Sequence, residues 1–265
     1  HRGLAHTLWL GVGSEFSSIS DIVPKVHWTG VPNVFDPRFA AFCRIRARQI
    51  LADHVEDPWV FGIFIDNELE WYGKVYSPGG VFDEAMKKAP DHSAKIALVR
   101  MLQERYPTIG QLNAAWNTGF ADFEAILEAD HIDTPLDNAS LMEDKLRYLA
   151  LVADTYFAVT TAAIREVDPY HMILGCRFAG DAPRPCWEAA GKYCDIVSVN
   201  QYPRINLETG RLPAAVADLV KFHEWCGRPL MLTEWSFPAL DSGLPCRHGA
   251  GMRVQTQQQR ARAFE

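Results

Sequence analysis

The sequence predicts an α/β protein whose parallel strands belong to a (β/α)8 barrel of the TIM-barrel type. Strand-like and helix-like segments alternate along the 265 residues, and the strand-like segments are almost wholly apolar, as in a sheet that is covered on both faces. The turn at residues 10–16 (LGVGSEF) has two glycines but lacks the third glycine of a dinucleotide-binding loop, and no phosphate-binding P-loop occurs. Polar residues that end successive strands favour the barrel over an open nucleotide-binding sheet.

The first elements are two apolar strands separated by one helix. The first strand is expected at residues 6–13 (HTLWLGVG), and a loop containing proline and glycine follows to residue 34. A helix over residues 35–54 begins with Asp36 as N-cap and proline at the first helical position, and its apolar residues keep helical spacing. The second strand is expected at residues 59–68 (WVFGIFIDNE). His6 begins the first strand, so we expect it at the face opposite the strand ends.

Residues 69–139 break the alternation and are expected to form a long insertion with short helical pieces, a length that is usually functional. The clearest helix of the chain follows. Ser140 with Glu143 reads as a capping box, apolar residues then form one stripe at spacings of three and four, and Asp168 with the next proline ends the helix.

The remaining elements continue the alternation. Strands are expected at 171–178, 195–202 and 228–237, and helices at 183–194 and 212–227. A glycine-rich loop, which holds Asp241 and His248, precedes a last helix capped by Thr256 with Gln259. The loop is either a lid over the site or a surface connection, and the second interpretation is preferred.

Composition excludes several functional classes. The chain is 48% hydrophobic and 22% charged, with a net charge of −7 and an isoelectric point of about 5.7, which is ordinary for a globular protein. No basic patch suggests a nucleic-acid partner, and no apolar run approaches the roughly 18 residues of a membrane span. None of the six cysteines forms a C-x-x-C pair, and the nine histidines make no metal-ligand spacing with them. No metal or other cofactor is therefore expected.

The ends of the sequence suggest a processed or partial chain, because it begins at His1 without a methionine and stops inside a helical pattern. An extracellular or periplasmic location is favoured if a signal peptide has been removed. The sequence leaves no mark of an oligomeric state.

Two glutamates close apolar strands, Glu68 as the last residue of the second predicted strand and Glu234 after the apolar run of the last. In a closed barrel, strands three apart face one another across the mouth, so the two carboxylates could approach to about 5–5.5 Å, the separation used by retaining glycosidases. In that chemistry one carboxyl group protonates the leaving oxygen, and the other attacks the anomeric carbon as an anion. The alternative is structural ion pairing with Arg177 or Arg204.

Other polar and aromatic residues at the strand ends are candidates for binding substrate. Tyr202 could donate a hydrogen bond to Glu234, and Asn67 could bind the sugar hydroxyl next to the reacting carbon. Alternation along a strand places Asp66 and Glu68 on one side and Asn67 on the other. The remaining candidates are Trp71 and Trp235 as the floor of a sugar subsite, and Arg177 and Asn200, each of which contacts either substrate or the acids.

The motifs DNE and TEW, which close strands three units apart, resemble the clan of (β/α)8 retaining glycoside hydrolases. Longer strings are similar to the β-agarase and β-galactosidase-like members, namely residues 32–39, 144–178, 195–202 and 233–265. The resemblance implies that Glu68 is the acid/base and Glu234 the nucleophile, with Asn67 on the sugar hydroxyl and Tyr202 as donor to the nucleophile. It also implies that residues 1–265 form one catalytic barrel domain that holds strands three to seven, incomplete at both ends, with residues 69–139 inserted after strand four.

The expected function is therefore a retaining glycoside hydrolase that degrades a β-linked, galactose-type (agar-like) oligo- or polysaccharide without a cofactor. Two alternatives stay open from the sequence. One is a catalytically inactive carbohydrate-binding protein on the same framework. The other is a metal-dependent hydrolase, which the lack of a histidine pair at the strand ends disfavours.

Overall fold

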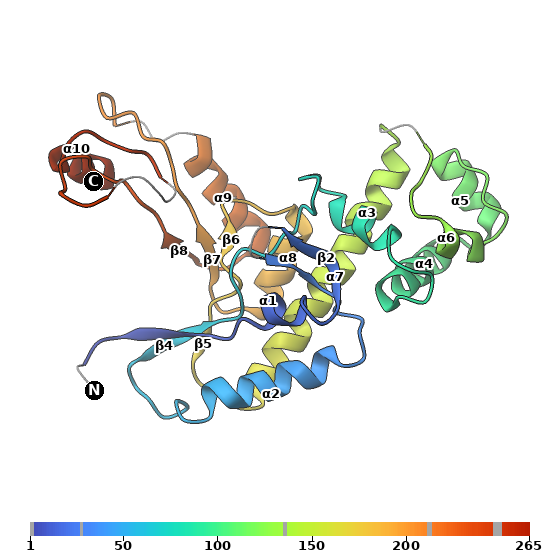
Figure 1. Ribbon diagram of the computed structural model, residues 1–265, viewed down its shortest axis with the longest axis horizontal. Helices are drawn as coiled ribbons and strands as arrows, with labels where there is room; N and C mark the ends of the chain where they lie inside the picture. Colours follow the sequence, from blue (N-terminus) through green and yellow to red (C-terminus); the bar gives the residue numbers. More distant parts are fainter. Residues whose placement is uncertain (1–2, 27–28, 135–136, 211–213, 246–250) are drawn as a thin grey trace.

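The computed structural model describes residues 3–26, 29–134, 137–210, 214–245 and 251–265. Its strands run through the centre of the molecule, with α2 (Phe39–Leu51) beside them, a group of small helices at one end and α10 (Gln257–Phe264) at the other (Figure 1). The candidate lid residue His248, and with it Cys246, lies outside the described residues.

The five predicted strands all form and pair in parallel. The strands are β1 (His6–Trp9), β4 (Val60–Phe64), β5 with β6 (Met172–Ile173 and Phe178–Ala179), β7 (Val197–Asn200) and β8 (Leu230–Glu234). β1 pairs with β4 and β4 with β5, while β6 pairs with β7 and β7 with β8. Neighbours in the sheet are therefore neighbours in the predicted strand order, as a (β/α) barrel requires.

The segment between β5 and β6 joins the two groups of strands. The Leu174 N–H donates to the Ile63 carbonyl oxygen at 2.9 Å, and the Ser198 N–H donates to the Leu174 carbonyl oxygen at 3.1 Å. β5 and β6 thus act as one central strand. Among the described residues, no further strand pairs with the outer edges of β1 and β8.

The longest helix, α7 (Ala139–Arg165), packs against α2 and α8 (Arg184–Tyr193), and α8 packs in turn against α9 (Ala214–Cys226). The apolar stripe of α7 is buried as predicted. The predicted cap is wrong by two positions, because the Asn138 side chain, not Ser140, accepts the N–H of Leu141 at 2.8 Å. α2 likewise begins at Phe39, and Asp36 closes the preceding turn by accepting the Arg38 N–H.

Residues 69–139 contain four helices that gather near the N-terminal end of α7 (Figure 1): α3 (Gly80–Met86), α4 (Ser93–Arg105), α5 (Ile109–Trp116) and α6 (Glu124–Glu128). Asp144 on α7 is fully buried and anchors two of them, α4 and α5. Its carboxylate accepts from Tyr106 Oη at 2.7 Å and Trp116 Nε1 at 2.8 Å, and Arg105 lies 2.9 Å away. Trp116 is therefore a core residue.

The sequence interpretation missed the antiparallel hairpin of β2 (Asp21–Val26) and β3 (Thr29–Pro32), which follows α1 (Val12–Phe16). Pro24 and Gly30 interrupt the apolar pattern and read as a loop. Glycine is required at position 30, because a Cβ there would lie 2.4 Å from the Val23 carbonyl oxygen. The capping box predicted for the last helix, Thr256 with Gln259, is confirmed. None of the helices that the structure describes is both long and apolar enough to cross a membrane.

Candidate active site

Glu68 lies four residues beyond the end of β4, and its backbone adopts a left-handed conformation with φ of 52°. Few non-glycine residues adopt it, and such strain is concentrated at functional sites. The Glu68 N–H faces the carbonyl oxygens of Cys176 and Arg177 at 3.3 and 3.2 Å, which holds the turn against the central strand. The Glu68 side chain then reaches Asn200 on β7, whose Nδ2 donates to Oε1 at 2.8 Å.

Glu234 ends β8, and both of its carboxylate oxygens accept strong hydrogen bonds. Arg177 donates to Oε1 and Tyr202 to Oε2, each at 2.5 Å. The predicted bond from Tyr202 is therefore confirmed, and Arg177 contacts one of the two acids. Burial, followed by the hydrogen bond to Glu234, raises the pKa of Tyr202 to about 12, so the hydroxyl remains a donor at neutral pH. Two donors, one of them cationic, suit an ionised carboxylate.

Asn200 connects the two glutamates and is almost fully buried. Its Nδ2 donates to Glu68, and its Oδ1 accepts from Thr233, the residue before Glu234, at 2.7 Å. These bonds fix the side-chain amide orientation, because Nδ2 faces acceptors and Oδ1 faces a donor. The sequence analysis missed Thr233, whose only signal is its place between an apolar strand and a glutamate.

The prediction that Asp66 and Glu68 lie on one side of the strand and Asn67 on the other is wrong. Asp66 points into the core, where it accepts from the backbone of Gly13 and Ser14 and from Tyr156 Oη on α7 at 2.6 Å. Asn67 and Glu68 instead both reach Asn200, with Asn67 Oδ1 3.3 Å from Asn200 Nδ2. β4 ends at Phe64, so strand alternation no longer applies, and the positive φ of Glu68 turns its side chain toward its neighbour's.

The prediction that Trp71 forms part of the floor of a sugar subsite is wrong. Trp71 is 2% exposed and packs against Tyr156 and Phe157, with ring centroids 5.5 and 6.2 Å away. Its indole is part of the core, so it offers no face to a ligand. Trp235 is 49% exposed and follows Glu234 directly, so it can present its ring to a sugar beside the carboxylates.

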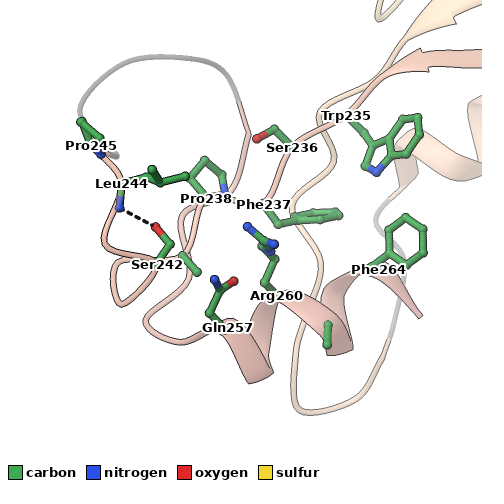
Figure 2. Close-up of a pocket in the computed structure, with 12 residues that line it drawn as sticks. Trp235, Ser236, Phe237, Pro238, Ser242, Leu244, Pro245, Gln257, Arg260 and Phe264 are labelled. Carbon is green, nitrogen blue, oxygen red and sulfur yellow. Dashed lines mark hydrogen bonds between the residues drawn. The ribbon is translucent and has the colours of Figure 1, made fainter.

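A hollow of about 560 Å³ opens beside Trp235 (Figure 2). Trp235 and Phe264 of α10 lie together at one side of it, with ring centroids 6.3 Å apart, while Arg260 and Gln257 of α10 extend toward its middle (Figure 2). An aromatic wall with polar groups opposite is suited to a sugar, which has apolar faces and a hydroxyl rim. Neither Glu68 nor Glu234 lines this hollow.

Comparison with known proteins places this arrangement in a family. Residues 33–239 match the model of glycoside hydrolase family 42, described as beta-galactosidase. The chain belongs to this beta-galactosidase family of glycoside hydrolases. The matched residues include Glu68, Glu234 and the side chains that join them.

Agarases are among the relatives of this family member. Over 252 residues it is 29% identical to beta-agarase B of Vibrio sp. (strain JT0107), and over 232 residues 31% identical to beta-agarase A of the same strain. These alignments cover 90% and 82% of the chain but only 24% and 22% of the agarases. The chain thus spans about a quarter of the length of the curated relatives that it matches.

Two solved structures extend the similarity to the fold. An exo-beta-agarase superposes with a TM-score of 0.79 at 26% identity over 97% of this chain and 34% of its own. The agarase AgWH50C gives a TM-score of 0.76 at 27% identity over 98% and 35%. The α/β architecture is therefore that of TIM-barrel-type glycoside hydrolase domains.

Proposed function

We propose that this chain carries the two catalytic carboxylates of a retaining β-glycosidase, with Glu234 as nucleophile and Glu68 as acid/base. The observation that carries the proposal is the difference in hydrogen bonding between two strand-end glutamates that Asn200 connects. Glu234 is held by two donors, Arg177 and Tyr202, whereas Glu68 receives a single amide bond.

The surroundings of Glu234 suit a nucleophile. The carboxylate must be ionised and aimed at the anomeric carbon before reaction. Charge-assisted bonds from Arg177 and Tyr202 stabilise the anion and fix its rotamer. These two hydrogen bonds weaken as Glu234 loses negative charge on bonding to the anomeric carbon. They therefore affect the rates at which the glycosyl-enzyme forms and breaks down.

The surroundings of Glu68 suit a proton donor. Oε1 accepts from Asn200, and no described residue donates to Oε2. Oε2 is therefore the atom that can hold a proton and pass it to the glycosidic oxygen, then take a proton from the water that attacks the intermediate. We expect the two carboxyl groups to lie about 5–5.5 Å apart in the complex with substrate.

We further propose that the substrate is a β-linked galactose-type oligo- or polysaccharide such as agar, because the named relatives are agarases. Trp235 would stack on a sugar ring beside the reacting bond, and Asn67 would bind the hydroxyl next to the anomeric carbon. In this proposal residues 1–265 act as one catalytic barrel unit, and residues 69–139 are an insertion that supports it.

Trapping with an activated 2-fluoro-galactoside tests the proposal. The fluorine slows breakdown of the glycosyl-enzyme, so the labelled residue can be found by proteolysis and mass spectrometry. We expect the label on the peptide that contains Glu234 and no label in Glu234→Ala. Glu68→Gln should still be labelled, because a good leaving group needs no acid. A label on another residue, or normal turnover of agaro-oligosaccharide by Glu234→Ala, would refute the assignment. Saccharide binding without release of reducing ends would indicate an inactive binding protein.

A further inference from the structure

A second group of chemically active side chains lies at the opposite ends of the strands. His6 is the first residue of β1, and His54 and Asp57 lie in the turn between α2 and β4. One ligand atom from each of the three lies within 4.8 Å of the other two, and His6 Nε2 is 3.9 Å from Asp57 Oδ2. This end of β1 and β4 is remote from Glu68, because the parallel strands carry the glutamates at their carboxyl ends (Figure 1).

Backbone hydrogen bonds hold the three residues in position. The Asp57 N–H donates to the His54 carbonyl oxygen at 3.0 Å, which closes the turn. The Trp59 N–H donates to Asp57 Oδ1 at 2.9 Å and thereby orients the carboxylate. The His6 N–H donates to the Trp59 carbonyl oxygen at 2.8 Å, so β1 is tied to the same turn. The backbone of the three residues and the Asp57 carboxylate are therefore ordered without an ion, which lowers the entropy cost of binding one.

The hydrogen bonding of the His6 ring also suits a role as a metal ligand. Its Nδ1 lies 3.4 Å from the Leu4 carbonyl oxygen, which can only accept a hydrogen bond. A proton on Nδ1 leaves Nε2, the atom that faces Asp57, with a free lone pair. Histidines that bind metals commonly donate their other ring N–H to a backbone carbonyl in this way.

The charge around the cluster attracts cations. The three residues line a hollow of about 590 Å³ together with Asp53, Glu56, Pro58 and Trp59. Three of these lining residues are acidic, and neither lysine nor arginine is among the described residues that line the hollow. A concave surface of one sign raises the local concentration of the opposite ion.

The ligand chemistry selects the ion. Mg²⁺ and Ca²⁺ require oxygen ligands, whereas two imidazoles with one carboxylate suit Zn²⁺ and related ions, with water in the fourth position. Tetrahedral Zn²⁺ with bonds of about 2.0–2.2 Å places its ligand atoms about 3.4 Å apart. Small rotations of these half-buried side chains would bring them from their present spacing to that distance.

We propose that His6, His54 and Asp57 bind a zinc-type divalent cation that ties β1 to the turn before β4. The ion is structural. It stabilises the edge strand at the end of the sheet opposite the carboxylates, and the glycosidase chemistry proposed above does not use it.

The test uses the untagged, chelator-treated chain and measures thermal unfolding and heats of binding with ZnCl₂, CoCl₂ and MgCl₂. At a zinc concentration 100-fold above Kd, linkage predicts a Tm increase of about 5–10 °C. His54→Ala and Asp57→Asn should each lose most of this increase and weaken binding by tenfold or more. Asn at position 57 keeps the acceptor for the Trp59 N–H, so its turn should survive. Co²⁺ should show the intense visible absorption of a four-coordinate ion.

Two control variants sharpen the result. His131→Ala removes an exposed histidine that pairs with Asp130, and His1→Ala removes another imidazole, which lies outside the described residues. Both should respond to zinc like the parent chain. The proposal is refuted if zinc fails to raise the Tm of the parent, if Mg²⁺ acts equally well, or if His1→Ala abolishes the effect while Asp57→Asn retains it. No readout involves substrate, so this outcome is independent of the proposed hydrolysis.

Discussion

Replacing Glu68 by Gln isolates the proposed proton transfer from the rest of the site. The Asn200 amide donates to Oε1 at 2.8 Å, and a glutamine keeps that acceptor. No described residue donates to Oε2, so the new NH₂ group meets no opposing donor. We therefore expect the free energy of unfolding to change by less than about 0.5 kcal/mol. The substitution removes the transferable proton and little else.

The expected loss depends on the leaving group. General acid catalysis contributes about 10²–10⁴-fold, or about 2.7–5.4 kcal/mol of transition-state stabilisation, so hydrolysis of a natural oligosaccharide should fall by that factor. A dinitrophenyl galactoside needs no protonation and should form the intermediate at a near-normal rate. Its slow breakdown should then accelerate with azide, which attacks without a general base.

Steady-state and burst kinetics on both substrates measure these effects. The matched control is Glu70→Gln, which changes a half-buried glutamate two residues further along the chain. The reasoning fails if Glu68→Gln hydrolyses the natural oligosaccharide within tenfold of the parent rate. It also fails if the two leaving groups suffer equally, because an acid catalyst must discriminate between them.

Three further changes have distinct expected outcomes. Tyr202→Phe removes a charge-assisted bond of about 1.5–3 kcal/mol and should slow turnover roughly 10- to 100-fold. The raised pKa of Tyr202, about 12, also predicts that folding stability falls as pH rises from 10 through 12, and this part of a pH–Tm curve should flatten in the variant. Asp144→Ala leaves buried donors unpaired and should cost about 3–5 kcal/mol in urea unfolding. Trp71→Ala should cost about 3–5 kcal/mol of stability, whereas Trp235→Ala should raise KM for oligosaccharides with little change in Tm.

A specific result would contradict each of these predictions. Normal turnover by Tyr202→Phe would separate that hydroxyl from the chemistry. The control is Asp154→Ala, at a carboxylate on the same helix that is 44% exposed and accepts from Lys192 and Tyr193. Equal unfolding free energies for the two variants would show that Asp144 is not an anchor. A KM effect from Trp71→Ala in a protein of normal stability would restore the predicted sugar platform.

The strand order could be predicted because apolar runs that end in polar residues are a local signal. Each of the five strands lies within its predicted range, but the first ends at Trp9, so that Val12 and Gly13 begin α1, and the third is divided into β5 and β6. The bond from Tyr202 to Glu234 follows from the adjacency of β7 and β8. The hairpin of β2 and β3 could not be found, since its stability depends on the close backbone approach at Gly30. That approach is a tertiary contact, which local propensity does not record.

Side-chain direction was the least predictable property. Trp71 carries the same residue type as Trp235 and lies as near to a glutamate in sequence, yet one indole fills the core and the other is half exposed. Only the position of α7, which brings Tyr156 against Trp71, decides between these outcomes. The cluster of His6 with His54 and Asp57 was hidden for the same reason, because its members approach through strand pairing rather than through a short sequence motif.

The run Asp66, Asn67 and Glu68 shows how one strand end serves two layers of the molecule. Asp66 turns inward and binds α1 and α7, and burial raises the pKa of its carboxyl group while four hydrogen bonds oppose that rise. Glu68 turns toward Asn200 because its positive φ breaks the strand geometry. Asp66 fixes the chain two residues before Glu68 through its bonds to α1 and α7. The backbone of the central strand holds the strained turn at Glu68 itself. Acids end this buried strand because one anchors the turn and the other is presented by it.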